Sequence, residues 1–129
     1  MFTIEQIIEA HSKVKSGADF PEYIKNLKSL GVMHYTTFVS DGHTVYYGIE
    51  DYKITSAEKH HPITITEVPN KEQFQVDLKS HQNGKTDYLT FCKDAAESGV
   101  EKWSVCLEEM TCIYFDKMGN KIQTEKIPV

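Results

Sequence analysis

The sequence predicts an α+β fold, with two pseudo-repeated helix-helix-strand-strand-strand units that share antiparallel β-sheet. Two observations lead to this prediction. Moving the chain by 68 positions lays residues 19–56 on residues 87–124 without a gap. Each of these segments also changes from helical to alternating spacing of its apolar residues. We expect a single domain over residues 1–129, with pseudo-repeats at about 3–56 and 70–124 and a linker at about 57–69.

The internal repeat rests on identity and on conserved side-chain type. Seven of the 38 aligned positions are identical, and many others keep the size and chemistry of the side chain. Neither unit is large enough to bury a comfortable core alone, so we expect the two to fold together. The most informative pairs are Gly31 and Gly99, Val32 and Val100, Tyr46 and Tyr114, Tyr35 and Trp103, and Thr36 and Ser104.

Each unit is predicted to begin with two helices. Thr3 and Asn70 are each followed three residues later by Gln, the pattern of a capping box at a helix start. Asp19 and Asp87 are typical N-cap residues for the second helix of each unit. These second helices are expected to end where glycine permits a left-handed C-cap, at Gly31 and Gly99.

Strands follow each pair of helices. Apolar and polar residues alternate after the C-cap glycines, which indicates strands with one buried face. Asp-Gly is a two-residue hairpin signal, and the repeat places a matching turn in the second unit. The turns are expected at Asp41-Gly42 and near Glu109-Met110, third strands around 52–55 and 121–124, and one more short strand at 63–66.

Hairpin register divides the strand residues between two faces, because residues opposite each other on paired strands share a face. Both faces carry many apolar side chains. Helices are expected to cover one face, and the second then needs the other repeat, a partner subunit or a ligand. The first face holds Tyr35, Thr37, Val39, Thr44, Tyr46, Trp103, Val105, Leu107, Cys112 and Tyr114, and the second holds Phe38, Val45, Tyr47, Ile49, Cys106, Ile113 and Phe115.

Composition excludes several classes of protein. The formal net charge is −5, and all 14 basic residues are lysine, so no arginine is available to read bases or fork onto phosphate. We expect no nucleic-acid partner and no membrane partner, since no apolar run approaches the ~20 residues of a membrane span. The N-terminal residues show no signal peptide, and the three cysteines suit reduced thiols of a cytoplasmic protein.

Residues in the second half resemble a known family. The run from His81 to Tyr88 contains His-x-x-Gly-Lys-Thr, and an aromatic-Cys pair follows at Phe91-Cys92. A Gly-Val pair and a Lys-Trp pair at 99–103 complete the pattern. The chain is similar to an uncharacterised family of small bacterial proteins, a domain of unknown function of which some members are labelled "phage envelope protein". The resemblance implies no activity or catalytic residues.

Two short motifs suggest chemistry. Glu58-Lys59-His60-His61-Pro62 resembles the Glu-Lys-x-x-His-His-Pro signature of pterin carbinolamine dehydratases, although two residues are missing, and the resemblance implies acid–base histidines. Gly84-Lys85-Thr86 matches the end of a P-loop, but the earlier glycine and the preceding strand are absent. No histidine set has compact ligand spacing, so we expect no metal site, and we expect no cofactor.

The function is expected to be binding. The sequence favours a small non-enzymatic binding or protein-interaction module that uses the second apolar face, with a homodimer or a small ligand as further arrangements. Candidate binding residues are Tyr35, Tyr47 and Trp103. The alternative is a small acid–base enzyme or ligand-binding protein, of the pterin carbinolamine dehydratase kind, with candidate catalytic residues His60, His61 and His81.

Overall fold

The computed structural model describes residues 2–14 and 19–127, which form two successive groups of helices and strands. Two helices and three strands come first, and the same order follows again, as the sequence predicts. The elements are α1 (Ile4–His11), α2 (Phe20–Leu30), β1 (His34–Phe38), β2 (Thr44–Tyr47), β3 (Lys53–Thr55), α3 (Lys71–Gln82), α4 (Tyr88–Glu97), β4 (Lys102–Cys106), β5 (Thr111–Phe115) and β6 (Lys121–Lys126).

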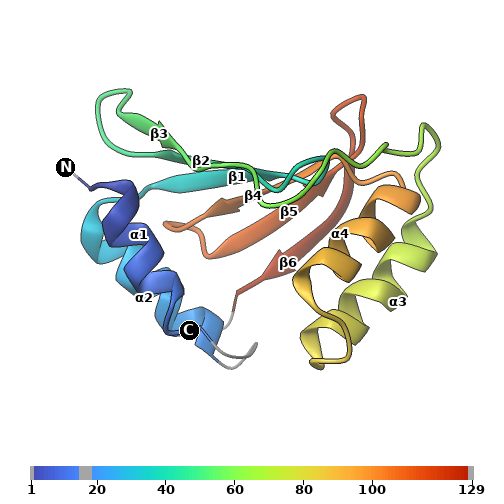
Figure 1. Ribbon diagram of the computed structural model, residues 1–129, viewed down its shortest axis with the longest axis horizontal. Coiled ribbons are helices and arrows are strands. Elements are labelled where there is room, and N and C mark those ends of the chain that lie inside the picture. Colours follow the sequence, from blue (N-terminus) through green and yellow to red (C-terminus); the bar gives the residue numbers. More distant parts are fainter. Residues whose placement is uncertain (1, 15–18, 128–129) are drawn as a thin grey trace.

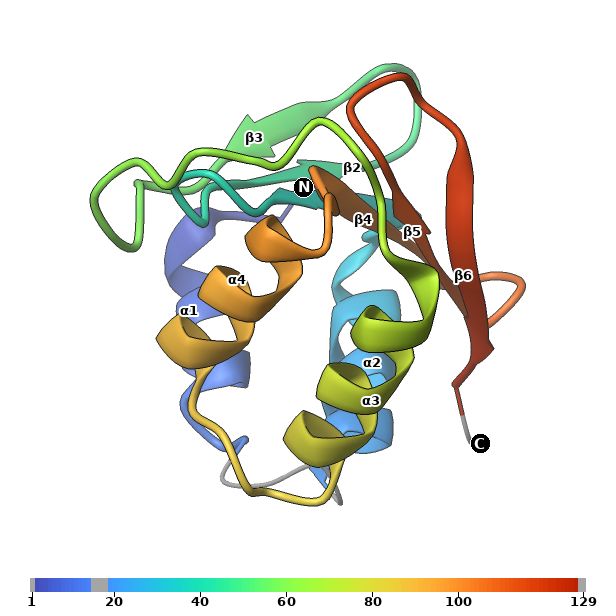
Figure 2. The same cartoon turned by 90° about the vertical axis from the view of Figure 1, so that its right-hand side faces the viewer.

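One antiparallel sheet joins all of these strands, in the order β3-β2-β1-β4-β5-β6. The two central strands, β1 and β4, come from different halves of the chain, so the halves meet edge to edge. Figures 1 and 2 show α1 and α2 beside each other under one half of the sheet and α3 and α4 under the other half. All four helices of the described residues lie on the same side of the sheet. The α+β prediction is therefore confirmed.

The helix starts follow the predicted capping residues. Thr3 and Gln6 form a reciprocal capping box at the start of α1. The Asn70 side chain accepts the N–H of Gln73 at the start of α3. At the start of α4, the Asp87 carboxylate accepts the N–H of Thr90 at 2.8 Å. These local hydrogen bonds fix where each helix begins, and the apolar stripe of the helix then decides which side faces the sheet.

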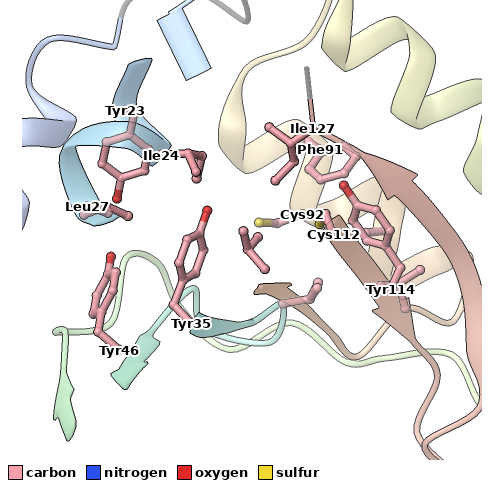
Figure 3. Close-up of a cluster of buried hydrophobic side chains, with 14 of the residues drawn as sticks. Tyr23, Ile24, Leu27, Tyr35, Tyr46, Phe91, Cys92, Cys112, Tyr114 and Ile127 are labelled. Carbon is pink, nitrogen blue, oxygen red and sulfur yellow. The ribbon is translucent and has the colours of Figure 1, made fainter. Parts of the chain in front are cut away.

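The core lies between the sheet and the helices. The face predicted to be covered is buried in β1, β2, β4 and β5, except for Trp103, which is half-buried. Figure 3 shows Ile24 and Leu27 of α2 and Phe91 and Cys92 of α4 converging above these strands. Phe74 of α3 is fully buried against Tyr114, with ring centroids 4.8 Å apart.

Tyrosine side chains give this core a polar layer. Figure 3 shows Tyr23 of α2 above Tyr46 and Tyr35 of the sheet, with the hydroxyl groups between the two layers. Burial raises the pKa of all three hydroxyls, and in Tyr23 the nearby Tyr46 adds to the effect. The buried hydroxyls of Thr37 and Thr44 lie 2.8 Å apart and satisfy each other. The core therefore stays neutral across the physiological pH range.

The linker differs from the prediction at one place. Residues 63–66 were expected to form a strand, but they form no strand and lie outside the sheet. The N–H of Ile63 bonds to the carbonyl of Ser40, and the N–H of Thr66 bonds to the carbonyl of Ala96. The segment therefore connects the β1–β2 turn with the end of α4. Ile65 is buried there, which explains the alternating apolar pattern without a strand.

The register of β1 and β4 is centred on positions that the repeat aligns. Thr36 lies opposite Ser104, 68 residues away, and their hydroxyl oxygens are 2.8 Å apart. An antiparallel pair of equivalent strands meets in this way about a local twofold axis. Common descent of the two halves stays a prediction, because element order and register do not test it.

Glycine at position 99 is predicted to be essential for the linker to dock on α4. Gly99 has φ +81°, and a Cβ there would lie 2.7 Å from Cα of Pro69. Gly84 has φ +76°, and a Cβ there would have no atom within 4 Å. Substitution of Gly84 therefore measures the cost of the left-handed backbone alone, without a steric clash. We expect Gly84→Ala to cost about 1 kcal/mol of unfolding free energy and Gly99→Ala about 3 kcal/mol, measured by urea titration. Equal losses would show that the linker moves aside freely.

Candidate functional site: the open face of the sheet

The face of the sheet away from the helices is not covered by any helix among the described residues. We call it the open face and define it by the outward side chains that the strand register assigns. Most of these side chains are half-buried, since they lie side by side, and none belongs to the core cluster. They are His34, Thr36, Phe38, Val45, Tyr47, Lys53, Thr55, Lys102, Ser104, Cys106, Thr111, Ile113, Phe115, Lys121, Thr124 and Lys126.

One cross-strand row on the open face alternates aromatic and cationic side chains. Phe38 of β1 lies opposite Lys102 of β4, which lies opposite Phe115 of β5. Lys121 of β6 pairs with Phe115 after a shift in register between Tyr114 and Phe115, and so lies next to the row. The Lys102 ammonium lies 5.9 Å from the Phe38 ring centroid and 5.8 Å from that of Phe115. Attraction between the ammonium and both rings holds the charge on the surface instead of letting it extend freely into solvent.

The opposite end of the open face carries a second aromatic pair. His34 of β1 stacks on Tyr47 of β2, with ring centroids 4.3 Å apart and planes 16° apart. Cys106 lies next to His34 on β4. Between the two aromatic ends, the linked hydroxyls of Thr36 and Ser104 mark the centre of the sheet. The open face thus has a polar centre with rings on either side.

The β1–β2 turn fixes one more ring at the edge of the open face. The Asp41 carboxylate accepts the backbone N–H of His43 at 2.9 Å and faces the His43 Nδ1 at 2.6 Å. The His43 imidazole in turn stacks on Phe38, with centroids 4.5 Å apart. Burial alone would raise the pKa of Asp41, but the hydrogen bonds from His43 outweigh it and the pKa is lowered. Asp41 therefore holds the His43 ring in place at the edge of the open face.

The three predicted binding residues lie on two different faces. Tyr35 is buried in the core beside Tyr46. Trp103 also faces the helices and packs against Phe91 and Tyr114. Only Tyr47 lies on the open face. Tyr35 and Trp103 therefore pack on the helix side of the sheet and Tyr47 lies on the open face, and a binding role for any of the three stays a prediction.

The three predicted catalytic histidines are not brought to one place. The backbone N–H of His60 bonds to Asp41, so His60 and His61 lie beside the β1–β2 turn. His81 belongs to the last turn of α3, which Figure 2 shows at the end of the molecule away from the sheet. Its Nδ1 donates to the carbonyl of Thr86 at 3.0 Å, and its ring stacks on Phe91. His81 therefore holds the α3–α4 loop, including Gly84-Lys85-Thr86, in place.

The cysteines are free thiols in two environments. Burial raises the pKa of Cys92 to about 11 and that of Cys112 to about 12, so both are protonated at neutral pH. Cys106 is half-buried on the open face. Within residues 2–14 and 19–127, no group of three His, Cys, Asp or Glu side chains is arranged to hold a metal ion.

Sequence reasoning placed the second face correctly but missed its charge. The sequence predicts Phe38 and Phe115 on this face, but the prediction does not include Lys102. The alignment by 68 residues and the hairpin parity put Lys102 on this face, but they do not fix which residue of β4 lies opposite Phe38. Pairing between β1 and β4 was the missing information, since hairpin signals specify only neighbours along the chain.

Fold and site together define a small α+β protein in which one face of a six-stranded sheet is packed and the other is open. The family model described as "Protein of unknown function (DUF1398)" matches residues 8–126 of the chain. The chain belongs to this family, which confirms its resemblance to an uncharacterised group. The search of curated proteins gave no match. None of the helices in the described part of the chain has the length and apolar character to cross a membrane.

Thiol labelling tests whether the open face is accessible in the isolated protein. With excess aromatic disulfide reagent at pH 8, we expect one thiol per chain, Cys106, to react quickly. Cys92 and Cys112 should react only as the protein unfolds, because they are buried and protonated. Cys106→Ser should remove the fast phase alone. A native protein without any fast thiol would show that something already covers the open face.

Proposed function

We propose that this protein is a non-enzymatic binding module that engages another protein through the open face of its sheet. The observation that carries the proposal is the position of every helix of the described residues on one side, while Phe38, Val45, Tyr47, Ile113 and Phe115 face outward on the other. Apolar and aromatic side chains on a face that no helix of the described residues covers are typical of interaction sites.

The size of the open face favours a transient complex. Strands spaced about 4.8 Å apart and about five residues long give a six-stranded face a footprint of roughly 500 Å². Stable complexes bury about 800 Å² on each partner. The open face alone is therefore better suited to reversible binding than to a permanent homodimer.

The proposal extends to the setting in which the module works. The chain has three free thiols, two of them deeply buried. Free thiols persist in a reducing compartment, and we therefore propose a cytoplasmic location. A bacterial source and a phage-related role stay expectations from the family resemblance. The alternative acid–base function would need His60, His61 and His81 around one substrate. His60 and His61 lie beside the β1–β2 turn and His81 lies in the last turn of α3, so their positions give it no support.

Site-specific photo-crosslinking tests the proposed function. A photoreactive phenylalanine analogue at Ile113, on the open face, should give discrete adducts with another protein in cells that naturally express the chain. The same analogue at Val76, an exposed apolar position on α3, is the matched control and should give far fewer. The proposal predicts this contrast because Ile113 lies on the open face, two residues from Phe115 on the same strand, whereas Val76 lies on α3, on the helical side of the sheet.

The proposal would be overturned if Ile113 and Val76 gave the same pattern of adducts, or if neither position gave any. Adducts from Val76 alone would assign the interaction to the helical side of the molecule.

A further inference from the structure

We propose that the open face binds an acidic amphipathic helix of a partner protein, whose carboxylates meet the lysines of the row formed by Phe38, Lys102, Phe115 and Lys121. This inference rests on the proposed function and names the partner's chemistry. Two observations carry it: the sign of the charge on the open face, and the spacing of the cations along the row.

The charge of the open face is opposite to that of the whole protein. The chain has 14 basic and 19 acidic residues. Leaving histidine aside, every charged residue of the open face is nevertheless a lysine. Lysines on edge strands commonly prevent sheets from pairing edge to edge, which accounts for those on β3 and β6. Lys102 lies on the inner strand β4, where that explanation does not apply.

Lys102 and Lys121 are available to a partner. Within residues 2–14 and 19–127, the ion pairs are His43 with Asp41 and Lys117 with Glu67, so neither lysine of the row is neutralised there. Lys102 is instead held over the Phe38 and Phe115 rings, which reduces the entropy that it would lose on binding a carboxylate.

A second copy of the chain fits this face poorly. Two open faces packed together would bring lysines toward lysines, and no Asp or Glu among the outward strand residues could meet them. Single-stranded nucleic acid also fits poorly. The chain is acidic and lacks arginine, and stacking of His43 on Phe38 and of His34 on Tyr47 already covers one side of these rings.

The spacing along the row matches a helix. Lys102 and Lys121 are two strands apart, which is about 10 Å. On an α-helix, residues i and i+7 lie on the same side about 10.5 Å apart, with i+3 and i+4 between them. Acidic side chains at i and i+7 would meet the two lysines, and apolar side chains at i+3 and i+4 would meet Phe115.

A charge exchange tests the inference. The probe is a fluorescent 18-residue helical peptide with Glu at i and i+7 and Leu at i+3 and i+4, and its affinity is followed by anisotropy at low salt. We expect Lys102→Glu to weaken binding about tenfold and to create binding of the same peptide with Lys in place of Glu. Lys25→Glu on α2 changes the net charge equally and should change affinity less than twofold. Lys102→Gln should weaken binding by an amount between the effects of Lys102→Glu and Lys25→Glu. Circular dichroism checks that each variant is folded.

Other outcomes overturn the inference. Failure of the acidic peptide to bind, or equal effects of Lys102→Glu and Lys25→Glu, would remove the acidic helix as the partner. Tighter binding of a 12-nucleotide single strand than of the peptide would assign the face to nucleic acid. Dimers that Ile113→Glu dissociates would assign it to a second copy. The proposed function survives failure of the acidic peptide, or equal effects of the two substitutions, if Ile113 gives specific adducts with another protein. It falls if Ile113 gives none or if the face binds nucleic acid.

Discussion

Pairing of β1 with β4 is the interaction on which the rest of the structure depends. It joins the two halves edge to edge in one sheet instead of stacking one half on the other. Each half contributes a pair of helices, and both pairs lie on the same side. The chain can therefore bury only one face of its own sheet. Of the three covers that the sequence left open for the second face, the other repeat is thereby excluded.

This division separates stability from binding. The inner face carries the fully buried side chains and the buried tyrosine hydroxyls, whose raised pKa keeps them protonated. The open face carries its rings at the two ends, with Lys102 fixed between Phe38 and Phe115. Side chains held by stacking in the free protein lose little freedom when a partner arrives. Positive charge on one face of an acidic protein also orients an acidic partner before contact.

Local signals predicted most of the fold. Capping residues such as Thr3 and Asp87 and the Asp41-Gly42 turn specify structure through neighbours in sequence, so helix starts and hairpins could be predicted. Residues 63–66 misled the prediction, because an alternating pattern also arises where one side chain, Ile65, is buried outside a sheet. The row of Phe38, Lys102 and Phe115 depends on pairing between distant strands, which no local signal encodes. Tyr35 and Trp103 were offered as binding residues because large aromatics serve packing and recognition alike.

One matched pair of substitutions tests most directly whether the two faces have different roles. Val105 faces the helices and is 1% exposed, whereas Val45 is half-buried on the open face. Urea unfolding of the isolated protein should show that Val105→Thr costs about 2 kcal/mol, because it buries an unpaired hydroxyl, and that Val45→Thr changes stability by less than about 0.5 kcal/mol. Equal losses would show that the open face is packed in the isolated protein, and its apolar side chains would then need no partner.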